Sequence, residues 1–135
     1  MKYLLDTNVI SEPLRPEPNR RVLRQLRRYG DEIAIPSVVW HELKFGLERL
    51  PPSRRRDAIE VYLADVVLTV PILDYDRAAA EWHARERARL IGRGETPAFI
   101  DGQIAAIART RDLALVTFNN ADFRRFDGLR IQSWG

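Results

Sequence analysis

Short apolar runs alternate along the chain with longer stretches in which apolar side chains recur every three or four residues. The apolar runs cover residues 2–5, 33–35, 66–73, 113–117 and 129–131, and Pro71 interrupts the third of them. Runs this short, rich in branched aliphatic side chains, are typical of buried strands. The pattern therefore predicts five strands distributed over the whole chain.

Helices are predicted between these strands. Asn19 can cap a helix over residues 20–29, in which Val22, Leu23 and Leu26 form an apolar stripe. The other helical stretches are a single turn at 7–12, residues 37–50 with Ser37 as the cap, residues 54–65, a long helix from Asp74 or Asp76 to Ile91, residues 96–110 starting at Thr96-Pro97, and a short helix from Asn119. Gly92 and Gly94 are expected to stop the long helix.

The alternation of strands with helices predicts the fold class α/β, with a short, mostly parallel sheet covered by helices on both faces. No internal repeat, low-complexity tract or linker divides residues 1–135, so one domain is expected. Functional sites in such sheets lie just outside the carboxyl ends of the strands. Two acids fall at those ends, Asp6 after the first strand and Asp122 soon after the fourth.

Composition narrows the classes of function. Of the 135 residues, 45% are hydrophobic and 30% are charged, the balance of a soluble globular protein. Cysteine is absent, which excludes disulfides, thiolate metal ligands and cysteine nucleophiles. Asp6 interrupts the apolar start of the chain before a signal peptide can form, and no apolar run is long enough to span a bilayer. We therefore expect a cytoplasmic protein with no membrane partner.

Arginine supplies nearly all of the positive charge, and the formal net charge is +3. The arginines crowd into three segments, residues 20–28, 54–56 and 85–93. The planar guanidinium group suits phosphate because it binds two oxygens at once. Charged helix faces are also commonly no more than solvated surface. The arginines alone therefore leave both nucleic-acid binding and plain solubility open.

Two further acids occupy helical positions whose neighbours are apolar. Side chains three and four residues apart share a helix face. Glu42 shares its face with Val38, Val39, Phe45 and Gly46, and Asp101 shares its face with Pro97, Ala98, Ile104 and Ala105. Because burying a lone carboxylate is costly, such an acid must be paired, protonated or bound to a metal ion. Pairing with a buried arginine or with the edge of the sheet is the ordinary explanation for each.

Asp6 and Asp122 have ordinary explanations of their own. Asp6 could cap the helical turn at residue 7, and Asp122 could stabilise the dipole of a helix capped by Asn119. A single shared site, in which all four carboxylates meet in one pocket, would explain the positions of all four acids together. Their repulsion would raise their pKa values unless a cation offsets it, and an all-oxygen donor set suits Mg²⁺ or Mn²⁺. Such a site supports hydrolysis of a phosphodiester by a metal-activated water.

The motifs of several other kinds of catalytic or binding site are incomplete or absent in the sequence. His41-Glu42 begins like a zinc-protease helix, but Phe45 stands where the second histidine is required, and His83 is the only other histidine. Neither a phosphate-binding glycine loop nor a dinucleotide-binding fingerprint is present. Gly102 weakens its predicted helix by about 1 kcal/mol, and it could serve either close packing or substrate approach.

Four segments resemble the four motifs of PIN-domain ribonucleases, in particular the VapC and FitB type toxins of bacterial toxin–antitoxin pairs. They are Leu5-Asp6-Thr7-Asn8-Val9-Ile10, Ser37-Val38-Val39-Trp40-His41-Glu42-Leu43-Lys44-Phe45-Gly46, Phe99-Ile100-Asp101-Gly102-Gln103-Ile104-Ala105-Ala106-Ile107-Ala108 and Leu115-Val116-Thr117-Phe118-Asn119-Asn120-Ala121-Asp122-Phe123. Asp-Thr-Asn alone is a weak signal. All four motifs in order, over the whole of a chain this short, are specific.

The resemblance implies a PIN-like three-layer α/β/α fold and an endoribonuclease that depends on Mg²⁺ or Mn²⁺. It makes Asp6, Glu42 and Asp101 the central acids and metal ligands, with Asp122 as the fourth acid. Asn119 could take part of the role of Asp122. The implied partners are an RNA substrate, a cognate antitoxin protein in a hetero-oligomer, and usually a second copy of the chain in a homodimer.

Supporting roles are expected for Thr7, Thr117 and Asn119, and Thr117 could orient a water or a carboxylate. We expect the helices at 20–28 and 85–93 to guide RNA toward the acids, so that affinity falls steeply with salt. The apolar residues Leu47, Leu50, Ile59 and Leu63 are expected to pack in the core, or else to form a groove for an antitoxin or a second subunit.

Three functions remain open from the sequence. The first is an RNA-cleaving toxin neutralised by an antitoxin, and the second is a nuclease of RNA processing or of structure-specific DNA cleavage. The acids do not separate these two, because a metal-activated water does not need the 2′-hydroxyl. The third is a non-catalytic module that only binds RNA or protein. Such a module usually loses acids, whereas this chain keeps all four.

Overall fold

A parallel five-stranded sheet forms the centre of the protein, which is described here over all of residues 1–135 in a computed structural model. The strands are β1 (Tyr3–Leu5), β2 (Ile33–Pro36), β3 (Ile72–Leu73), β4 (Ala114–Val116) and β5 (Ile131–Gln132). Their order across the sheet is β3-β2-β1-β4-β5, and every neighbouring pair is parallel. The carboxyl ends of β1 and β4 therefore lie side by side at one edge, with Leu5 opposite Val116.

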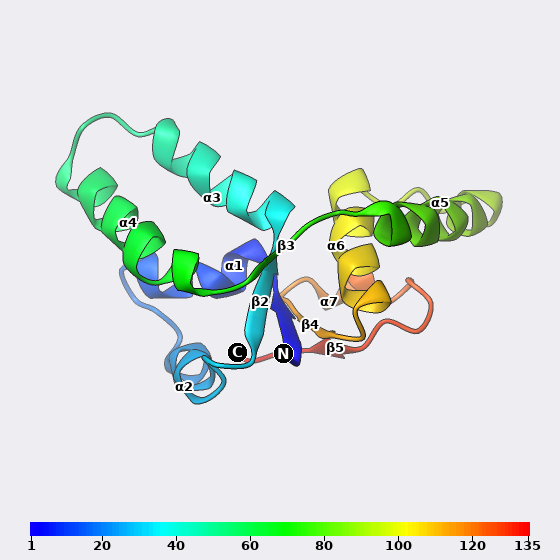
Figure 1. Ribbon diagram of the computed structural model, residues 1–135, viewed down its shortest axis with the longest axis horizontal. Helices are drawn as coiled ribbons and strands as arrows, with labels where there is room; N and C mark the ends of the chain where they lie inside the picture. Colours follow the sequence, from blue (N-terminus) through cyan, green and yellow to red (C-terminus); the bar gives the residue numbers. More distant parts are fainter.

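Helices cover both faces of the sheet. They are α1 (Thr7–Ile10), α2 (Arg20–Arg28), α3 (Ser37–Glu48), α4 (Arg54–Asp65), α5 (Arg77–Gly92), α6 (Phe99–Thr110) and α7 (Asn120–Phe123), with short 3-10 helices η1 (Glu12–Leu14) and η2 (Val67–Thr69). Right-handed crossovers place the helices before β3 on one face and those between β3 and β4 on the other. Figure 1 shows this division, with α1 to α4 on one side of the strands and α5 and α6 on the opposite side. The predicted three-layer α/β/α fold is confirmed.

The core lies between the sheet and these helices. The strands contribute fully buried side chains such as Leu4, Leu5, Ile35 and Leu115, and the middle of α6 is buried from Ile104 to Ala108. Leu47 and Leu63 are also in the core and Ile59 packs against it, which confirms core packing for these three residues, whereas Leu50 is half-buried outside the core. None of the helices combines the length and the apolar composition needed to cross a membrane.

Two helix starts with a side-chain cap, at Asn19 and Asp76, were predicted correctly. The side chain of Asn19 accepts hydrogen bonds from the backbone N–H groups of Arg21 and Val22, and that of Asp76 accepts from Ala79. Each satisfies backbone donors that the first turn of a helix leaves without a partner. Gly94 follows α5 with a φ of 78°, a conformation that favours glycine and ends the helix.

Four element boundaries differ from the predictions. Ser37 does not cap α3; it is the first helical residue, and Pro36 precedes it without a side-chain cap. The helix predicted from Thr96 begins later, because its first backbone hydrogen bond runs from Gly102 to the Ala98 carbonyl. The third strand is confined to Ile72–Leu73, since the residues before Pro71 form η2. The last strand lies at Ile131–Gln132 instead of residues 129–131.

Gly102 serves close helix packing. A Cβ atom at this position would lie 2.1 Å from Nε2 of His83, which projects from α5 against α6. The His83 ring is buried and packs beside Phe99. Its Nδ1 and the Tyr75 hydroxyl form a 2.8 Å hydrogen bond. Of the two roles considered for Gly102, close packing and substrate approach, the structure therefore supports close packing against α5. His41, by contrast, is exposed on α3.

Candidate active site

Asp6 lies immediately after β1 and caps α1. One carboxylate oxygen accepts a hydrogen bond from the backbone N–H of Thr7 at 2.8 Å, as the capping interpretation predicted. The other oxygen accepts from the hydroxyl of Thr117 at 2.9 Å. Thr117 directly follows β4, so the parallel pairing of β1 with β4 brings these two residues together. Asp6 is 8% exposed, and one edge of its carboxylate is therefore fixed by the sheet itself.

Glu42 joins the same polar chain from α3. Its Oε2 accepts a 2.6 Å hydrogen bond from the hydroxyl of Thr7, and the side chain is half-buried. At the other end, the backbone N–H of Asn119 donates to the Thr117 hydroxyl at 3.0 Å. Hydrogen bonds therefore connect Asn119, Thr117, Asp6, Thr7 and Glu42 in sequence. The three residues expected in supporting roles, Thr7, Thr117 and Asn119, all take part in this series of hydrogen bonds.

Asp101 enters the site from the first turn of α6 and is half-buried. Burial raises the pKa of its carboxyl above the ordinary value, and the negative charges of Asp122, Asp6 and Glu42 raise that pKa further. Only Arg125 opposes this shift. Asp101 is thus within electrostatic reach of the other three predicted acids, although the four come from separate segments of the chain.

None of the four acids forms a salt bridge. The ordinary explanation for Glu42 and Asp101, a buried arginine partner for each, is therefore wrong. Asp122 differs from the others because it is exposed on α7, where it occupies the first turn as predicted. Asn119 precedes α7 but makes no side-chain cap bond, so its contribution to the site runs through its backbone.

The carboxylate oxygens of these four acids suit a hard divalent cation that binds only one or two of them directly. No group of three or more acidic or histidine side chains is arranged to surround a metal ion. Mg²⁺ commonly takes one or two protein carboxylates, keeps several waters and adds substrate phosphate oxygens. Carboxylates whose mutual repulsion raises the pKa of Asp101 fit such an ion, because a cation would offset that repulsion.

Arg125 is a residue of this region that the sequence analysis missed. Its Nε is buried without a hydrogen-bond partner, and its positive charge is the one that lowers the pKa of Asp101. The Arg125 carbonyl accepts a 3.1 Å hydrogen bond from Arg89, which anchors the backbone at this point. Nothing in the sequence separates this arginine from the many others except its place three residues after Asp122.

The two arginine-rich helices differ from each other. The arginines of α2 form no ion pair, whereas in α5 Arg89 is bound to Glu86 and Arg87 lies over the ring of Phe99. The expected role in guiding RNA is therefore better supported in α2, where all five arginines are exposed and lack an ion pair, than at residues 85–93, where only Arg85 and Arg93 are exposed and lack one. A hollow of about 680 Å³ runs beside α2, and none of the four acids lines it.

The chain is similar to known proteins over nearly its whole length. The family model described as PIN domain matches residues 3–129. The chain belongs to the PIN-domain family. It is 33% identical to the tRNA(fMet)-specific endonuclease VapC of Shigella flexneri, over 99% of this chain and 98% of the relative. It is 32% identical to Toxin FitB of Neisseria gonorrhoeae, over 97% of each.

Solved PIN-domain structures show the same architecture. The crystal structure of FitAcB from Neisseria gonorrhoeae matches with a TM-score of 0.87 and 32% identity, over 96% of this chain and 95% of that one. A member of the VapBC family of toxin–antitoxin systems from Mycobacterium tuberculosis matches with a TM-score of 0.70 and 27% identity, over 98% and 96%. The predicted resemblance to PIN domains of the VapC and FitB type is confirmed at the level of family and fold.

Proposed function

We propose that this PIN-domain protein is a divalent-metal-dependent endoribonuclease that acts as the toxin of a toxin–antitoxin pair. The observation that carries the proposal is the state of Asp101: burial and three other carboxylates raise its pKa, and no salt bridge neutralises any of the four. Acids that only stabilise a fold are normally paired. Acids held close together without a partner suit a cation that arrives from solution.

In this proposal Asp6, Glu42 and Asp101 hold Mg²⁺ or Mn²⁺ directly or through water, and Asp122 completes the acidic set. When bound, the ion supplies an activated water and neutralises charge on the phosphate in the transition state. The chain itself fixes the acids. The Thr117 hydroxyl and the backbone N–H of Thr7 each hold one oxygen of Asp6, and the Thr7 hydroxyl holds one oxygen of Glu42, whose other oxygen accepts no hydrogen bond from these threonines.

RNA is the substrate class that the relatives favour. The VapC of Shigella flexneri is named as an endonuclease specific for a transfer RNA, and it is similar to this chain over nearly its whole length. We extend the substrate class to this chain, but not the choice of a particular RNA. The activity would then take place in the cytoplasm, where the RNA is.

A cognate antitoxin is the partner that we propose. The similar FitB is named a toxin, and the matched structure from Mycobacterium tuberculosis is described as belonging to a toxin–antitoxin system. An apolar hollow of about 320 Å³ between α2 and the α4–η2 segment offers a surface for such a protein. It is lined by residues that include Leu23, Leu26, Tyr62 and Val66. A homodimer stays a prediction, which light scattering of the purified chain would check.

Cleavage of RNA in the presence and absence of metal tests the enzymatic half of the proposal. The purified chain should cut RNA in Mg²⁺ or Mn²⁺ and lose this activity in EDTA. Cleavage that persists in EDTA would overturn metal dependence, and cleavage of structured DNA but not RNA would identify the other class of nuclease. Metal titration by calorimetry without carboxylate-dependent heat would indicate a pure binding module.

Expression in cells tests the toxin half. Production of the chain should stop growth, and co-production of the small protein encoded by the neighbouring gene should restore growth and co-purify with the chain. An RNA-cleaving chain that leaves growth unaffected would be a nuclease of another role.

A further inference from the structure

The positive charge of the protein is concentrated in one helix. Helix α2 has the sequence Arg-Arg-Val-Leu-Arg-Gln-Leu-Arg-Arg, with five arginines and no acid, so it carries a formal charge of +5. The whole chain has 22 basic and 19 acidic residues and a net charge of +3. The remaining residues therefore carry 3 − 5, or −2. The protein is a slightly acidic body with one strongly basic helix.

The arginines of α2 are exposed and have no acidic partner. They are Arg20, Arg21, Arg24, Arg27 and Arg28, and none of them takes part in a salt bridge or a side-chain hydrogen bond. Elsewhere, exposed arginines such as Arg111 and Arg130 do find an acid, Asp76 and Asp112 respectively. Clustering of unneutralised guanidinium groups on one helix raises the local potential and attracts a polyanion.

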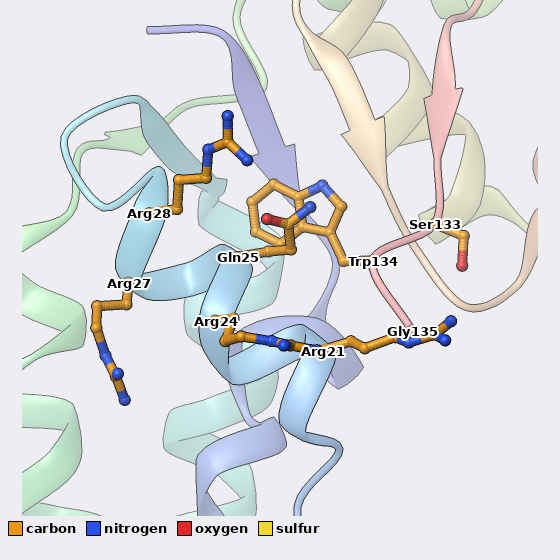
Figure 2. Close-up of a pocket in the computed structure, with 8 residues that line it drawn as sticks. All are labelled: Arg21, Arg24, Gln25, Arg27, Arg28, Ser133, Trp134 and Gly135. Carbon is orange, nitrogen blue, oxygen red and sulfur yellow. The ribbon is translucent and has the colours of Figure 1, made fainter.

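These arginines face a hollow on the surface. Arg21, Arg24, Arg27 and Arg28 line it together with Gln25 and the segment Ser133, Trp134 and Gly135. Figure 2 shows Arg21 extended toward Gly135, and Trp134 beside Gln25 at the base of the hollow. Trp134 is buried against the rings of Tyr3 and Tyr29, which makes the floor rigid. Arg24 and Arg27 also line a second hollow on the other flank of the helix.

The arginine hollow connects to the acids through Phe118. The ring of Phe118 lies close to Gly135, since a Cβ on that glycine would be 3.2 Å from Cε1 of Phe118 and 3.6 Å from the side-chain amide of Asn19, which caps α2. Phe118 directly follows Thr117, whose hydroxyl binds Asp6. Phe118 is 40% exposed, a large apolar ring open to solvent between the two sites.

We propose that the arginine face of α2 (Arg21, Arg24 and Arg28) and Phe118 form a track that holds the sugar-phosphate backbone and one base of single-stranded RNA outside the acidic site. The inference rests on the proposed function and adds to it the path of the substrate. Proteins that hold single strands without sequence preference combine a basic groove with aromatic rings on which bases stack. Both elements are present here, adjacent to each other, and the acids lie beyond the ring.

Binding of a labelled, unstructured RNA oligonucleotide tests this track. Fluorescence anisotropy in EDTA, over a range of KCl concentrations, measures affinity without metal-dependent cleavage. The variant Arg21→Gln/Arg24→Gln/Arg28→Gln should bind about tenfold or more weakly at 0.1 M salt, and its slope of log affinity against log salt should be shallower by about 2, because three phosphate contacts are lost at about 0.7 each. Phe118→Ala should weaken binding about fivefold or more, and Phe118→Trp should restore it.

A matched control removes three arginines elsewhere. Arg54→Gln/Arg55→Gln/Arg77→Gln makes the same change in net charge at exposed residues that form no ion pair and lie on α4 and α5. It should retain wild-type affinity and most of the wild-type slope. Equal weakening by the two triple variants would overturn the track, as would an affinity that does not depend on salt, or loss of antitoxin binding by the α2 variant with RNA binding intact.

The same measurements separate this inference from the proposed function. A wild-type chain that cuts RNA, with an α2 variant that binds RNA as tightly as the control, would overturn the track and leave the nuclease standing. A chain that never cuts RNA, but binds it through α2, would support the track and refute the nuclease.

Discussion

Two carboxylates on neighbouring helices, one buried and one half-buried, have opposite surroundings. Glu86 of α5 accepts hydrogen bonds from two nitrogens of Arg89 and, at 2.7 Å, from the backbone N–H of Asp127. The hydrogen bonds from Arg89 hold the pKa of Glu86 below its ordinary value. Asp101 of α6 has no ion pair, and burial and three nearby carboxylates hold its pKa above the ordinary value.

The difference separates acids that stabilise the fold from the acids that we propose to bind a metal ion. Glu86 ties the loop at Asp127 to α5, and Glu12 similarly accepts from the backbone N–H of Asn19 at 2.8 Å. Both are buried, and both are satisfied by the chain itself. Asp101 and its neighbours have no positive partner within the chain, since Arg125 is near but not bonded. Burial alone therefore does not distinguish the two kinds of acid, whereas the charge of the groups around each acid does.

The largest difference should appear when Asp101 is neutralised. Asp101→Asn is expected to reduce RNA cleavage by about a hundredfold or more, because charge stabilisation by a metal ion contributes several kcal/mol to the transition state. Single-turnover cleavage in Mg²⁺ measures the loss. Asp65→Asn, an exposed acid at the end of α4, is the control and should cleave at the wild-type rate. Equal rates for Asp101→Asn and the wild type would remove Asp101 from the site.

Glu86 should behave in the opposite way. Glu86→Ala removes the partner of Arg89 and of the Asp127 N–H, so the free energy of unfolding should fall by about 3 kcal/mol. Urea denaturation measures this change. Glu81→Ala, an exposed acid on the same helix, is the control and should differ from wild type by less than about 0.5 kcal/mol. A Glu86 variant as stable as the wild type would erase the proposed distinction.

The contact between α5 and α6, which sets the position of Asp101, can be changed at Gly102. Gly102→Ala should lower the free energy of unfolding by about 2 kcal/mol, because the added Cβ collides with the His83 ring. Gly46→Ala is the matched control within α3, where a Cβ meets nothing within 4 Å. That variant should be more stable than wild type by up to about 1 kcal/mol, since alanine favours helix. Destabilisation of both variants alike would argue against the His83 contact.

The smallest expected effect is the dependence on pH, and its sign differs between the two acids. A raised pKa for Asp101 means that its ionisation weakens the folded state, so Asp101→Asn should raise the melting temperature at pH 7. That gain should vanish as the pH falls through the raised pKa, where wild-type Asp101 is already neutral.

Glu86 has a lowered pKa, so its ionised form stabilises the folded state above the ordinary pKa, and that stability is lost as the pH falls through the lowered value. Glu86→Gln should therefore lower the melting temperature at pH 7 and differ least from wild type in acid. Melting curves of both variants from pH 7 to pH 3 check the two signs together. Parallel pH profiles for the two variants would refute the contrast.

Structural features that depend on residues close together in the sequence could be predicted without coordinates. Alternating apolar runs and amphipathic stretches predicted the α/β fold, and caps such as Asn19 and Asp76 act on backbone groups two or three residues away. The same reasoning went wrong at Ser37, which is already the first residue of α3, and at Thr96, since α6 begins only at Phe99. The resemblance to PIN domains supplied the identity of the four acids, and their apolar helix faces supplied the reason to consider them.

Only the tertiary structure decided which acids meet and which are neutralised. Thr7 binds Glu42 across 35 residues, and Thr117 binds Asp6 across 111, because a parallel sheet places the ends of distant strands at one edge. Glu86 has Arg89 three residues along its own helix, but its second partner, the Asp127 N–H, and two of the carboxylates that act on Asp101, those of Asp6 and Glu42, come from distant parts of the sequence. Electrostatic interactions act through space, so the charge around an acid follows from the fold and not from its neighbours in the sequence.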